Sequence, residues 1–260
     1  MNKYKVLELA KKYGLKTLDT VCVKKNVIPK GIEYPVITKS ISPVEGGWKA
    51  DVHICHSENE LKIAYEKIKA STVILQKYIE KKNEYCVDGF CADRGRIMFN
   101  AIESTYNYLI PGYYSPYMTV KKFNNPDLRE AMEGIMKEIE FEGIYSIEFL
   151  IDQDDTYYFS EINFRNSTWS YAATCAGMNL PVLWAKAMVS GKLETAEEDI
   201  WVEDFMAMVE PIDYGKRVKP KEIGLGEWLI DFKEAKCAFY YNKEDPEPFI
   251  HMCKNWEKFS

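Results

Sequence analysis

Two glutamates, an asparagine and an arginine stand where a purely structural strand would rarely keep such side chains. Residues 145–165 read as two apolar strands joined by the polar turn DQDDT, and they carry Glu148, Glu161, Asn163 and Arg165. Carboxylate and amide oxygens form a hard ligand set, which suits Mg²⁺ and leaves positions open for phosphate oxygens. The residue types therefore indicate a divalent-cation site.

The hairpin itself must bring these oxygens together. A two- or four-residue loop centred on residues 153–154 pairs Asp152 with Asp155 and places Glu148 diagonally across from Glu161, at about 7–8 Å between backbones. Such a loop predicts one polar face and one core face. The polar face consists of Ser146, Glu148, Leu150, Tyr157, Phe159, Glu161 and Asn163. The core face consists of Tyr145, Ile147, Phe149, Ile151, Tyr158, Ser160, Ile162 and Phe164.

Two alternatives remain open for this hairpin. The polar face could simply be wet, with both carboxylates solvated, although Leu150, Tyr157 and Phe159 on the same face argue against full exposure. A three-residue loop or a bulge would instead place Glu148 and Glu161 on opposite faces and remove the case for a shared cation.

The bulk composition excludes some classes of function. The 260 residues, 47% of them apolar, can bury a large core in one domain or two closely joined lobes. Lysine and arginine number 34 against 40 acids, and a net charge of −6 argues against a nucleic-acid partner. Seven cysteines without a CxxC pair, no signal peptide and no long apolar run predict a reduced, cytoplasmic protein without a membrane partner.

Several segments ahead of the hairpin could bind an anion. A short helix is predicted at 3–13, and the strand 34–40 ends in Lys39. Gly46 and Gly47 follow in a loop beside Lys49, where freed backbone amides and a lysine can surround an anion. Neither the GxxxxGK[ST] nor the GxGxxG pattern is present.

The remaining segments alternate strands and helices. Ser57 and Glu60 form a capping box for a helix that ends near Lys69. The other predicted elements are strands on either side of a link at 77–82, a strand at 96–105, a loop at 106–119, a helix at 125–140, and a helix at 167–190 interrupted near 177–181. The tail from 194 predicts a helix at 228–236, a strand at 238–242 and a final helix.

With its segments in this order, the chain resembles the ATP-grasp superfamily over about residues 1–195. YPVITK, EGGWK, LQKYIEKKNEY, IEFLID and SEINFRNS match that family's motifs in sequence order. The EINFR spacing is similar to that of carboxylate–amine ligases and of the carbamoyl-phosphate synthetase lobes. The run from NFRNS to LWAKAM and the DPEPF tail resemble D-aspartate-ligase-like members.

The resemblance implies a role for each matching residue. It implies that the nucleotide contacts Lys3, Lys39, Gly46, Gly47, Lys49, Gln76, Lys77, Tyr78, Ile79 and Glu84, with adenine read by the backbone of Lys77 and Ile79 and the ribose held by Glu84. It also implies that Glu148 and Glu161 share two Mg²⁺ ions (Mn²⁺ is the alternative), and that Asn163 binds one of them. Arg165, facing the reacting carboxylate, and Lys39 are the implied catalytic residues.

The implied fold is α+β, with two lobes whose antiparallel sheets hold ATP between them. The corresponding domains are an N-terminal lobe at 1–80, a C-terminal lobe with the hairpin at 81–195, and an accessory region at 196–260. The implied reaction joins a small-molecule carboxylate to an amine, such as an amino acid, through an acyl phosphate. The family's usual front α/β domain is not in this sequence. Either the sequence is a piece of a longer protein, or a separate chain carrying that domain is an expected partner, and a homodimer is the other partner considered. A non-catalytic ATP-binding module is the alternative function.

Overall fold

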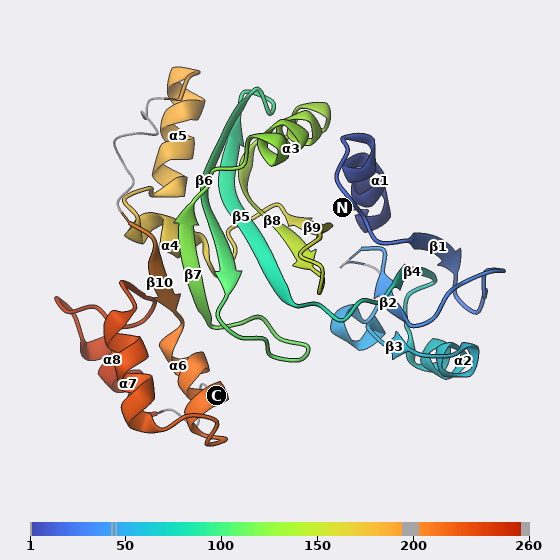
Figure 1. Ribbon diagram of the computed structural model, residues 1–260. Helices are drawn as coiled ribbons and strands as arrows, with labels where there is room; N and C mark the ends of the chain where they lie inside the picture. The colour runs from blue at the N-terminus through green and yellow to red at the C-terminus, as the bar shows by residue number, and fades with distance from the viewer. Residues whose placement is uncertain (1, 43, 45, 194–202, 256–260) are drawn as a thin grey trace. The chain divides into compact units, whose positions relative to one another are not determined.

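The computed structural model describes residues 2–42, 44, 46–193 and 203–255, apart from the side chain of Trp48. Their contacts divide the chain into two compact units, each made of several segments (Figure 1). Unit 1 comprises Met1–Lys82, Asp127–Ile135 and Ile147–Ile162. Unit 2 comprises Asn83–Pro126, Met136–Ser146 and Asn163–Ser260.

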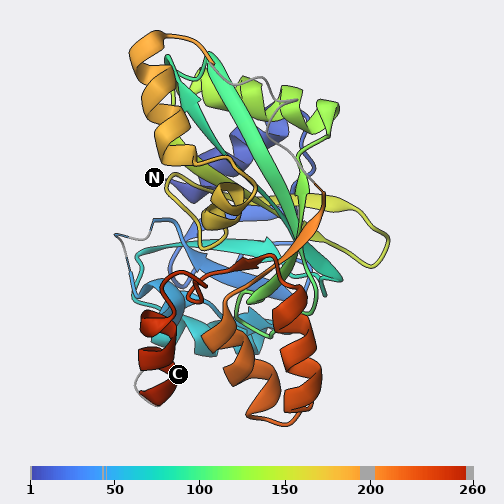
Figure 2. The same ribbon diagram turned by 90° about the vertical axis from the view of Figure 1, so that its left-hand side faces the viewer.

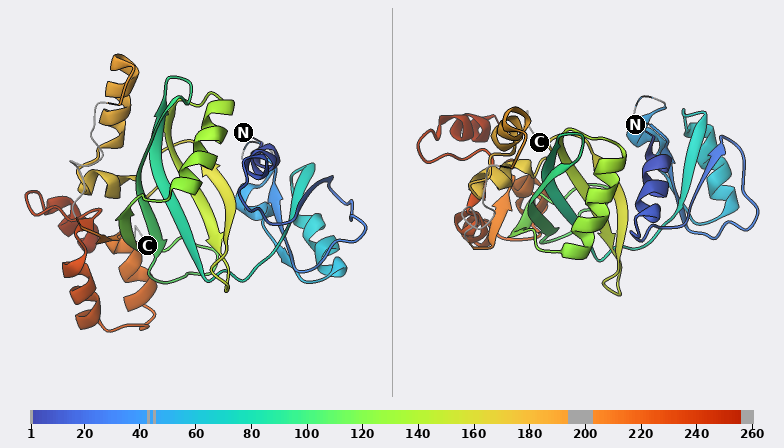
Figure 3. Two further views of the ribbon diagram at one scale, coloured as in Figure 1. Left: turned by 45° about the horizontal axis from the view of Figure 1, so that its top comes forward. Right: turned by 90° about the horizontal axis from the view of Figure 1, so that it is seen from above.

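Unit 1 is built on a four-stranded antiparallel sheet with the strand order β1-β4-β2-β3. Its strands are β1 (Thr20–Lys24), β2 (Val36–Ser40), β3 (Ile54–Cys55) and β4 (Thr72–Lys77). Helix α2 (Glu58–Lys67) lies alongside this sheet (Figure 3) and buries Leu61, Ala64 and Tyr65 against it. The Ser57 side chain accepts the Glu60 amide at 3.2 Å, so the predicted helix start is confirmed.

The rest of unit 1 surrounds helix α1 (Lys3–Lys12). The Lys3 amide donates to the Ile41 carbonyl just after β2, and the Phe159 amide donates to the Lys16 carbonyl just after α1. Helix α3 (Pro126–Glu138) approaches closely, since a Cβ at Gly134 would collide with the Tyr13 ring. Unit 1 also contains a 3₁₀ turn, η1 (Trp48–Asp51).

A second sheet has seven strands in the order β11-β10-β7-β6-β5-β8-β9. Its strands are β5 (Asn83–Ala92), β6 (Ile97–Tyr106), β7 (Tyr117–Lys122), β8 (Gly143–Ile151), β9 (Tyr157–Asn163), β10 (Phe205–Met208) and β11 (Cys237–Ala238). β10 pairs antiparallel with β7 and parallel with β11, so one pair departs from the antiparallel expectation. In Figure 2, α4 (Ser170–Cys175) and α5 (Leu180–Ser190) lie over this sheet, and both pack into its core.

The C-terminal part of unit 2 is helical. It contains α6 (Glu210–Asp213), a π-helical turn η3 (Tyr214–Val218), α7 (Leu225–Glu234) and α8 (Glu247–Lys254). The predicted strand at 238–242 is wrong beyond Ala238. The buried Glu210 carboxylate accepts the amides of Phe239, Tyr240 and Tyr241 at 2.8–3.2 Å. The Phe239 amide also donates to the Met208 carbonyl at 3.2 Å, so the ladder ends there, and the next two amides bond to the carboxylate instead.

The α+β class is thus confirmed, and the interrupted helix at 167–190 is found as α4 and α5. The loop predicted at 106–119 ends earlier, because β7 begins at Tyr117. The predicted division into lobes at 1–80 and 81–195 and an accessory region at 196–260 stays a prediction. All seven cysteines are free thiols, and Cys253 is exposed. Within the described part of the chain, every helix is too short or too polar to span a lipid bilayer.

Candidate functional site

A polar row crosses one face of the unit 1 sheet. Strand register places Gln76 opposite both Ile37 and Thr20, with Lys39 two residues further along β2 on the same face. Lys39 Nζ donates to Gln76 Oε1 at 2.8 Å, and Gln76 Nε2 donates to Thr20 Oγ1 at 3.0 Å. Gln76 is buried, so its amide fixes the lysine in place. Two predicted nucleotide contacts therefore lie side by side, and Thr20 is a third polar residue that the sequence did not indicate.

The glycine loop is anchored by a carboxylate that sequence reasoning missed. Asp51 is fully buried and accepts the amides of Gly47 at 2.7 Å, Lys69 at 2.8 Å and Ala70 at 3.2 Å. Gly46 has φ +99°, and a Cβ there would collide with the Asp51 carboxylate and lie 2.7 Å from the Ala70 Cβ. Both predicted glycines are thus required by close approach to Asp51. Lys49 is exposed at the start of the same turn.

Backbone hydrogen bonds hold the predicted adenine-reading segment. The Lys77 amide donates to the Asp19 carbonyl at 2.8 Å, and the Tyr78 amide donates to the Pro35 carbonyl at 2.9 Å. The Ile79 amide has no acceptor among the described residues. The segment therefore leaves β4 in a fixed conformation, with the Ile79 N–H available to a ligand.

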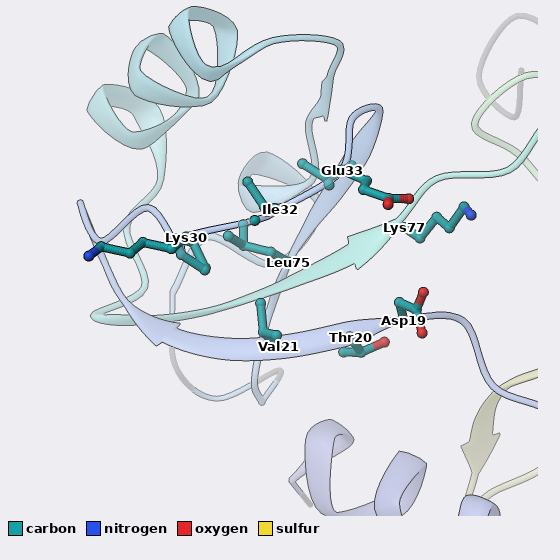
Figure 4. A pocket seen from close by; sticks show the side chains of 11 residues that line it. Asp19, Thr20, Val21, Lys30, Ile32, Glu33, Leu75 and Lys77 are labelled. Carbon is teal, nitrogen blue, oxygen red and sulfur yellow. The ribbon is translucent and has the colours of Figure 1, made fainter.

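A cavity of about 280 Å³ opens beside this segment (Figure 4). Val21, Ile32 and Leu75 form its apolar part, and the charged side chains of Asp19, Glu33 and Lys77 gather at one end. The cavity shares Leu75 with the core under α2, so it lies on the sheet face opposite the Lys39–Gln76 row. Only Lys77 among its lining residues was predicted as a ligand contact.

The turn of the β8–β9 hairpin differs from the prediction. The Asp152 amide donates to the Thr156 carbonyl at 3.1 Å, and Asp155 has φ +59°, which defines a three-residue loop. The expected pairing of Asp152 with Asp155 is therefore wrong. The Asp152 carboxylate explains the difference, because it accepts the amides of Asp154 at 3.0 Å and Thr156 at 2.9 Å and so stabilises the longer turn.

This turn shifts the side-chain alternation by one residue next to it. Phe149 and Phe159, expected on opposite faces, are both buried with ring centroids 5.8 Å apart. Burial along β9 then skips from Phe159 to Ile162, while Ser160 and Glu161 are both partly exposed. The regular alternation predicted between Asp152 and Asn163 is therefore wrong, although Glu148 and Glu161 are both partly exposed.

Glu161 has a cationic partner within unit 1. Lys3 Nζ lies 2.9 Å from Glu161 Oε2, and the two side chains keep 28% and 33% of their accessible surface. The bond joins the first turn of α1 to β9 across 158 positions of sequence. Two residues predicted for different roles, one for the nucleotide and one for the metal, are therefore direct neighbours.

Asn163 and Arg165 lie together in unit 2. Arg165 Nη2 donates to Asn163 Oδ1 at 3.4 Å, and Nη1 donates to the Asn166 carbonyl at 2.9 Å. The arginine is exposed, so its remaining donors face solvent. Glu84, the predicted ribose contact, is partly exposed on β5 of the same unit, and its amide donates to the Asn83 side chain at 2.7 Å.

The proposed metal ligands fit a hard divalent cation by their chemistry. Glu148 and Glu161 supply carboxylate oxygens and Asn163 supplies an amide oxygen, which is the set that Mg²⁺ prefers. Two of these groups already attract positive charge, since Glu161 pairs with Lys3 and Asn163 accepts from Arg165. Among the described residues, no three Asp, Glu, His or Cys side chains gather into a metal-binding group. Any site here therefore depends on the asparagine or on phosphate oxygens.

No protein-family model matches the chain. The chain is similar to the carbamoyl phosphate synthase large chain of Pyrococcus furiosus, with 26% identity over 198 residues covering 72% of this chain and 18% of that protein. It is also similar to N5-carboxyaminoimidazole ribonucleotide synthase of Staphylococcus aureus, with 26% identity over 163 residues covering 60% of this chain and 42% of that protein. The chain thus spans less than half the length of either relative.

The fold is similar to that of solved structures with bound nucleotide. The biotin carboxylase domain of Hydrogenobacter thermophilus 2-oxoglutarate carboxylase, in complex with MgADP and bicarbonate, aligns with a TM-score of 0.63. The sequence identity is 23%, and the alignment covers 80% of this chain and 49% of that chain. The ordered motifs, the α+β fold and these similarities agree with the predicted resemblance to the ATP-grasp superfamily.

Proposed function

We propose that this chain is an ATP-dependent carboxylate–amine ligase. A carboxylate oxygen attacks the γ-phosphorus of ATP, the bond to ADP breaks, and an acyl phosphate forms. An amine nitrogen then attacks the acyl carbon, phosphate leaves, and the nitrogen loses a proton to give the amide. The observation that carries the proposal is the pairing within unit 1 of the predicted phosphate and metal contacts, Lys39 with Gln76 and Lys3 with Glu161.

The nucleotide part of the proposal rests on three segments of unit 1. The Lys39 ammonium, held by Gln76, would face the phosphates, with Lys3 and Lys49 supplying further positive charge. The Gly46–Gly47 backbone would cover them, and the Asp51 anchor keeps that turn in a defined shape. The Lys77–Ile79 backbone would read adenine through the Lys77 carbonyl and the Ile79 amide, with Tyr78 between them. Glu84 in unit 2 is the proposed ribose contact.

The metal part of the proposal assigns two Mg²⁺ ions, or Mn²⁺ in their place, to Glu148 and Glu161, with Asn163 on one of them. Bound there, the ions would neutralise the triphosphate and polarise its γ-phosphate. Lys3 would then serve as a second partner that lowers the negative charge around Glu161.

Arg165 and Lys39 are the proposed catalytic residues. The attacking carboxylate and the triphosphate are both anions, so charge repulsion forms a large part of the barrier. The Arg165 guanidinium is planar and can bind a carboxylate through two parallel hydrogen bonds. Its present bonds to Asn163 and Asn166 orient it while leaving donors available. The Lys39 ammonium would stabilise charge on the transferring phosphoryl group.

The substrates belong to small-molecule classes, a carboxylate and an amine such as an amino acid. A separate chain with the family's front domain, or a second copy of this chain, is the proposed partner. We place the protein in the cytoplasm, because its thiols include the exposed Cys253, which suits a reducing compartment.

The decisive test combines binding and turnover. The full chain is titrated with ATP and MgCl₂ by thermal shift. ADP release is then followed with bicarbonate, acetate and the twenty amino acids as carboxylates, and with ammonia and amino acids as amines. We expect Mg²⁺-dependent stabilisation by ATP and ADP release only with a productive pair. Binding without substrate-dependent ADP release would replace the ligase with a non-catalytic nucleotide-binding module.

A matched pair of variants controls this test. Glu161→Gln should abolish ADP release, since it removes a proposed metal ligand. Glu58→Gln removes an exposed glutamate that is not among the proposed contacts and whose partner Lys62 lies at 2.6 Å, so turnover should be unchanged. Equal activity of the two variants would rule out the metal assignment.

A further inference from the structure

Asp88 on β5 is a buried carboxylate that the proposed reaction does not use. It has no accessible surface, and it accepts the Ser167 hydroxyl at 2.7 Å and the Ser170 hydroxyl at 2.8 Å. Burial raises the pKa of Asp88 to about 6, against the opposing effect of hydrogen bonds from Ser167, Ser170 and Ser146. Its second oxygen, Oδ2, is buried without a hydrogen-bond partner among the described residues. Burying a carboxylate oxygen without a hydrogen bond lowers the stability of the fold, so the presence of Asp88 needs a functional explanation.

The strand is irregular at this carboxylate. Asp88 lies opposite Ile102, while Gly89 lies opposite Asn100, so one residue of β6 is skipped. The next residue must be glycine, because a Cβ at Gly89 would collide with the Phe99 carbonyl and lie 2.6 Å from the Tyr145 hydroxyl. Bulges change the direction of a side chain, and they are frequent beside active sites. The regular pairing of β5 with β6 is therefore interrupted at Asp88, whose side chain contacts Ser167 and Ser170.

The two serines form a closed network at the start of α4. The Ser167 amide donates to the Ser170 hydroxyl oxygen at 2.9 Å, and the Trp169 amide donates to the Ser167 hydroxyl oxygen at 3.0 Å. The N-cap residue Trp169 makes no side-chain cap bond. The start of α4 is therefore fixed by hydrogen bonds that end on Asp88 rather than by an ordinary cap.

The same segment carries the proposed catalytic arginine. Arg165 donates to the carbonyl of Asn166, the residue immediately before Ser167, and to the side chain of Asn163. A continuous chain of contacts thus runs from Asp88 in the sheet through Ser167 to the guanidinium. All of these residues belong to unit 2.

We infer that Asp88 is a positioning residue for Arg165. Through Ser167 and Ser170 it holds residues 166–170 in one conformation, and this conformation directs the guanidinium toward the acyl substrate. The inference rests on the proposed function for the role of Arg165. The hydrogen bonds between Asp88, Ser167 and Ser170 do not depend on that function.

Three variants and a matched control test the inference in the full chain. Asp88→Ala removes the acceptor, Asp88→Asn keeps one acceptor oxygen, and Ser167→Ala removes one donor. The control is Asp213→Asn, which alters an equally buried carboxylate elsewhere in unit 2. The measurements are hydrogen exchange of residues 163–170, the KM values for ATP and for the carboxylate that gives most ADP release in the panel above, and kcat.

We expect Asp88→Ala to speed exchange at 163–170 and to raise the carboxylate KM or lower kcat, about 10- to 100-fold in kcat/KM, with the ATP KM unchanged. Asp88→Asn should lose less kcat/KM than Asp88→Ala. Ser167→Ala should also affect the carboxylate and leave the ATP KM unchanged, with a smaller loss of kcat/KM. Asp213→Asn should lower stability without this split. If Asp88→Ala does not fold, Asp88→Asn and Ser167→Ala decide.

Two results would overturn the inference. One is unchanged exchange at 163–170 in every variant, which would show that Asp88 does not hold the segment. The other is an equal loss for ATP and for the carboxylate, which would reduce Asp88 to a structural role. Failure of the proposed function is seen separately, as wild-type protein that releases no ADP with any pair, and the exchange measurement still tests the network in that case.

Discussion

Two ion pairs of nearly equal length show how differently charge is used in two regions of the molecule. Lys3 and Glu161 in unit 1 are 2.9 Å apart, and their side chains keep 28% and 33% of their accessible surface. Arg217 and Asp213 in the helical part of unit 2 are 2.7 Å apart and keep 11% and 0%. Arg217 binds Asp213 through both Nε and Nη2, whereas Lys3 makes a single contact, and the two pairs also differ strongly in burial.

The buried pair belongs to a larger hydrogen-bond network. The Asp213 carboxylate also accepts the Tyr108 hydroxyl at 2.6 Å and the Trp228 indole N–H at 2.8 Å. Arg217 reaches Asp231 at 2.6 Å with its other terminal nitrogen. Such a network specifies how α6, η3 and α7 pack.

The partly exposed pair is suited to the opposite use. Exposed ion pairs contribute little to stability, because water solvates both charges almost as well. A lysine and a glutamate held together where both remain partly exposed can exchange partners with an incoming phosphate or cation at low cost. Burial therefore separates charges that hold the fold from charges available for binding, and the predictions below test that separation.

The largest expected effect is on turnover. Glu161→Gln should abolish ADP formation, a loss of about 1000-fold or more, because one proposed metal ligand becomes a neutral amide. The same variant should lower the free energy of unfolding by no more than about 1 kcal/mol. A coupled ADP assay and urea denaturation measure the two quantities on one preparation. Near wild-type turnover would contradict the metal assignment.

The reverse pattern is expected for the buried pair. Arg217→Met should lower the free energy of unfolding by about 3–5 kcal/mol, because it leaves the Asp213 charge buried without its main partner. Mg²⁺-dependent stabilisation by ATP should persist, since no proposed contact lies in this network. The urea midpoint and a thermal-shift titration test both halves. A loss below about 1 kcal/mol would remove the distinction between the two pairs.

Asp88 provides a pH-dependent case within unit 2. Its pKa of about 6 in the folded protein lies above the ordinary value of 3.8, so the folded state binds a proton more tightly than the unfolded chain. This carboxylate therefore destabilises the fold above about pH 6, by roughly 3 kcal/mol, and the cost disappears as the pH falls from about 6 to about 4.

The measurement is a comparison with Asp88→Asn, which cannot titrate. The free energy of unfolding of the wild type, relative to that of the variant, should rise as the pH falls from 7 to 4. Urea denaturation of both proteins at several pH values in this range gives the difference. Parallel curves would show that Asp88 titrates alike in the folded and unfolded states.

Sequence reasoning succeeded where short-range rules apply. The capping box at Ser57 set the start of α2, and the interrupted helix predicted at 167–190 is found as α4 and α5. Ordered motifs predicted the resemblance to the ATP-grasp superfamily, and the α+β fold and the similar proteins agree with it. These features depend on residues close in sequence, whose periodicity is visible without a structure.

It failed where a side chain competes for backbone groups. The Asp152 carboxylate turned a two-residue loop into a three-residue loop, and Glu210 ended β11 by accepting three amides. Asp51 was missed for a related reason, since two of its partners, the amides of Lys69 and Ala70, lie 18 and 19 positions away. Such acceptors look like ordinary surface acids in a sequence.

The smallest expected effect tests most directly the difference between the partly exposed and the buried ion pair. Lys3→Gln should lower the free energy of unfolding by about 0.2–1 kcal/mol, because Glu161 can be solvated once its partner is gone. The effect should shrink further in 1 M NaCl, where the Debye length is about 3 Å. Nucleotide affinity should fall by more than stability does, since the ammonium is a proposed phosphate contact. Urea denaturation at two salt concentrations and an ATP titration give the three numbers. A salt-independent loss near 3 kcal/mol would mean that this pair holds the fold as Arg217 and Asp213 do, and that partial exposure does not mark charges available for binding.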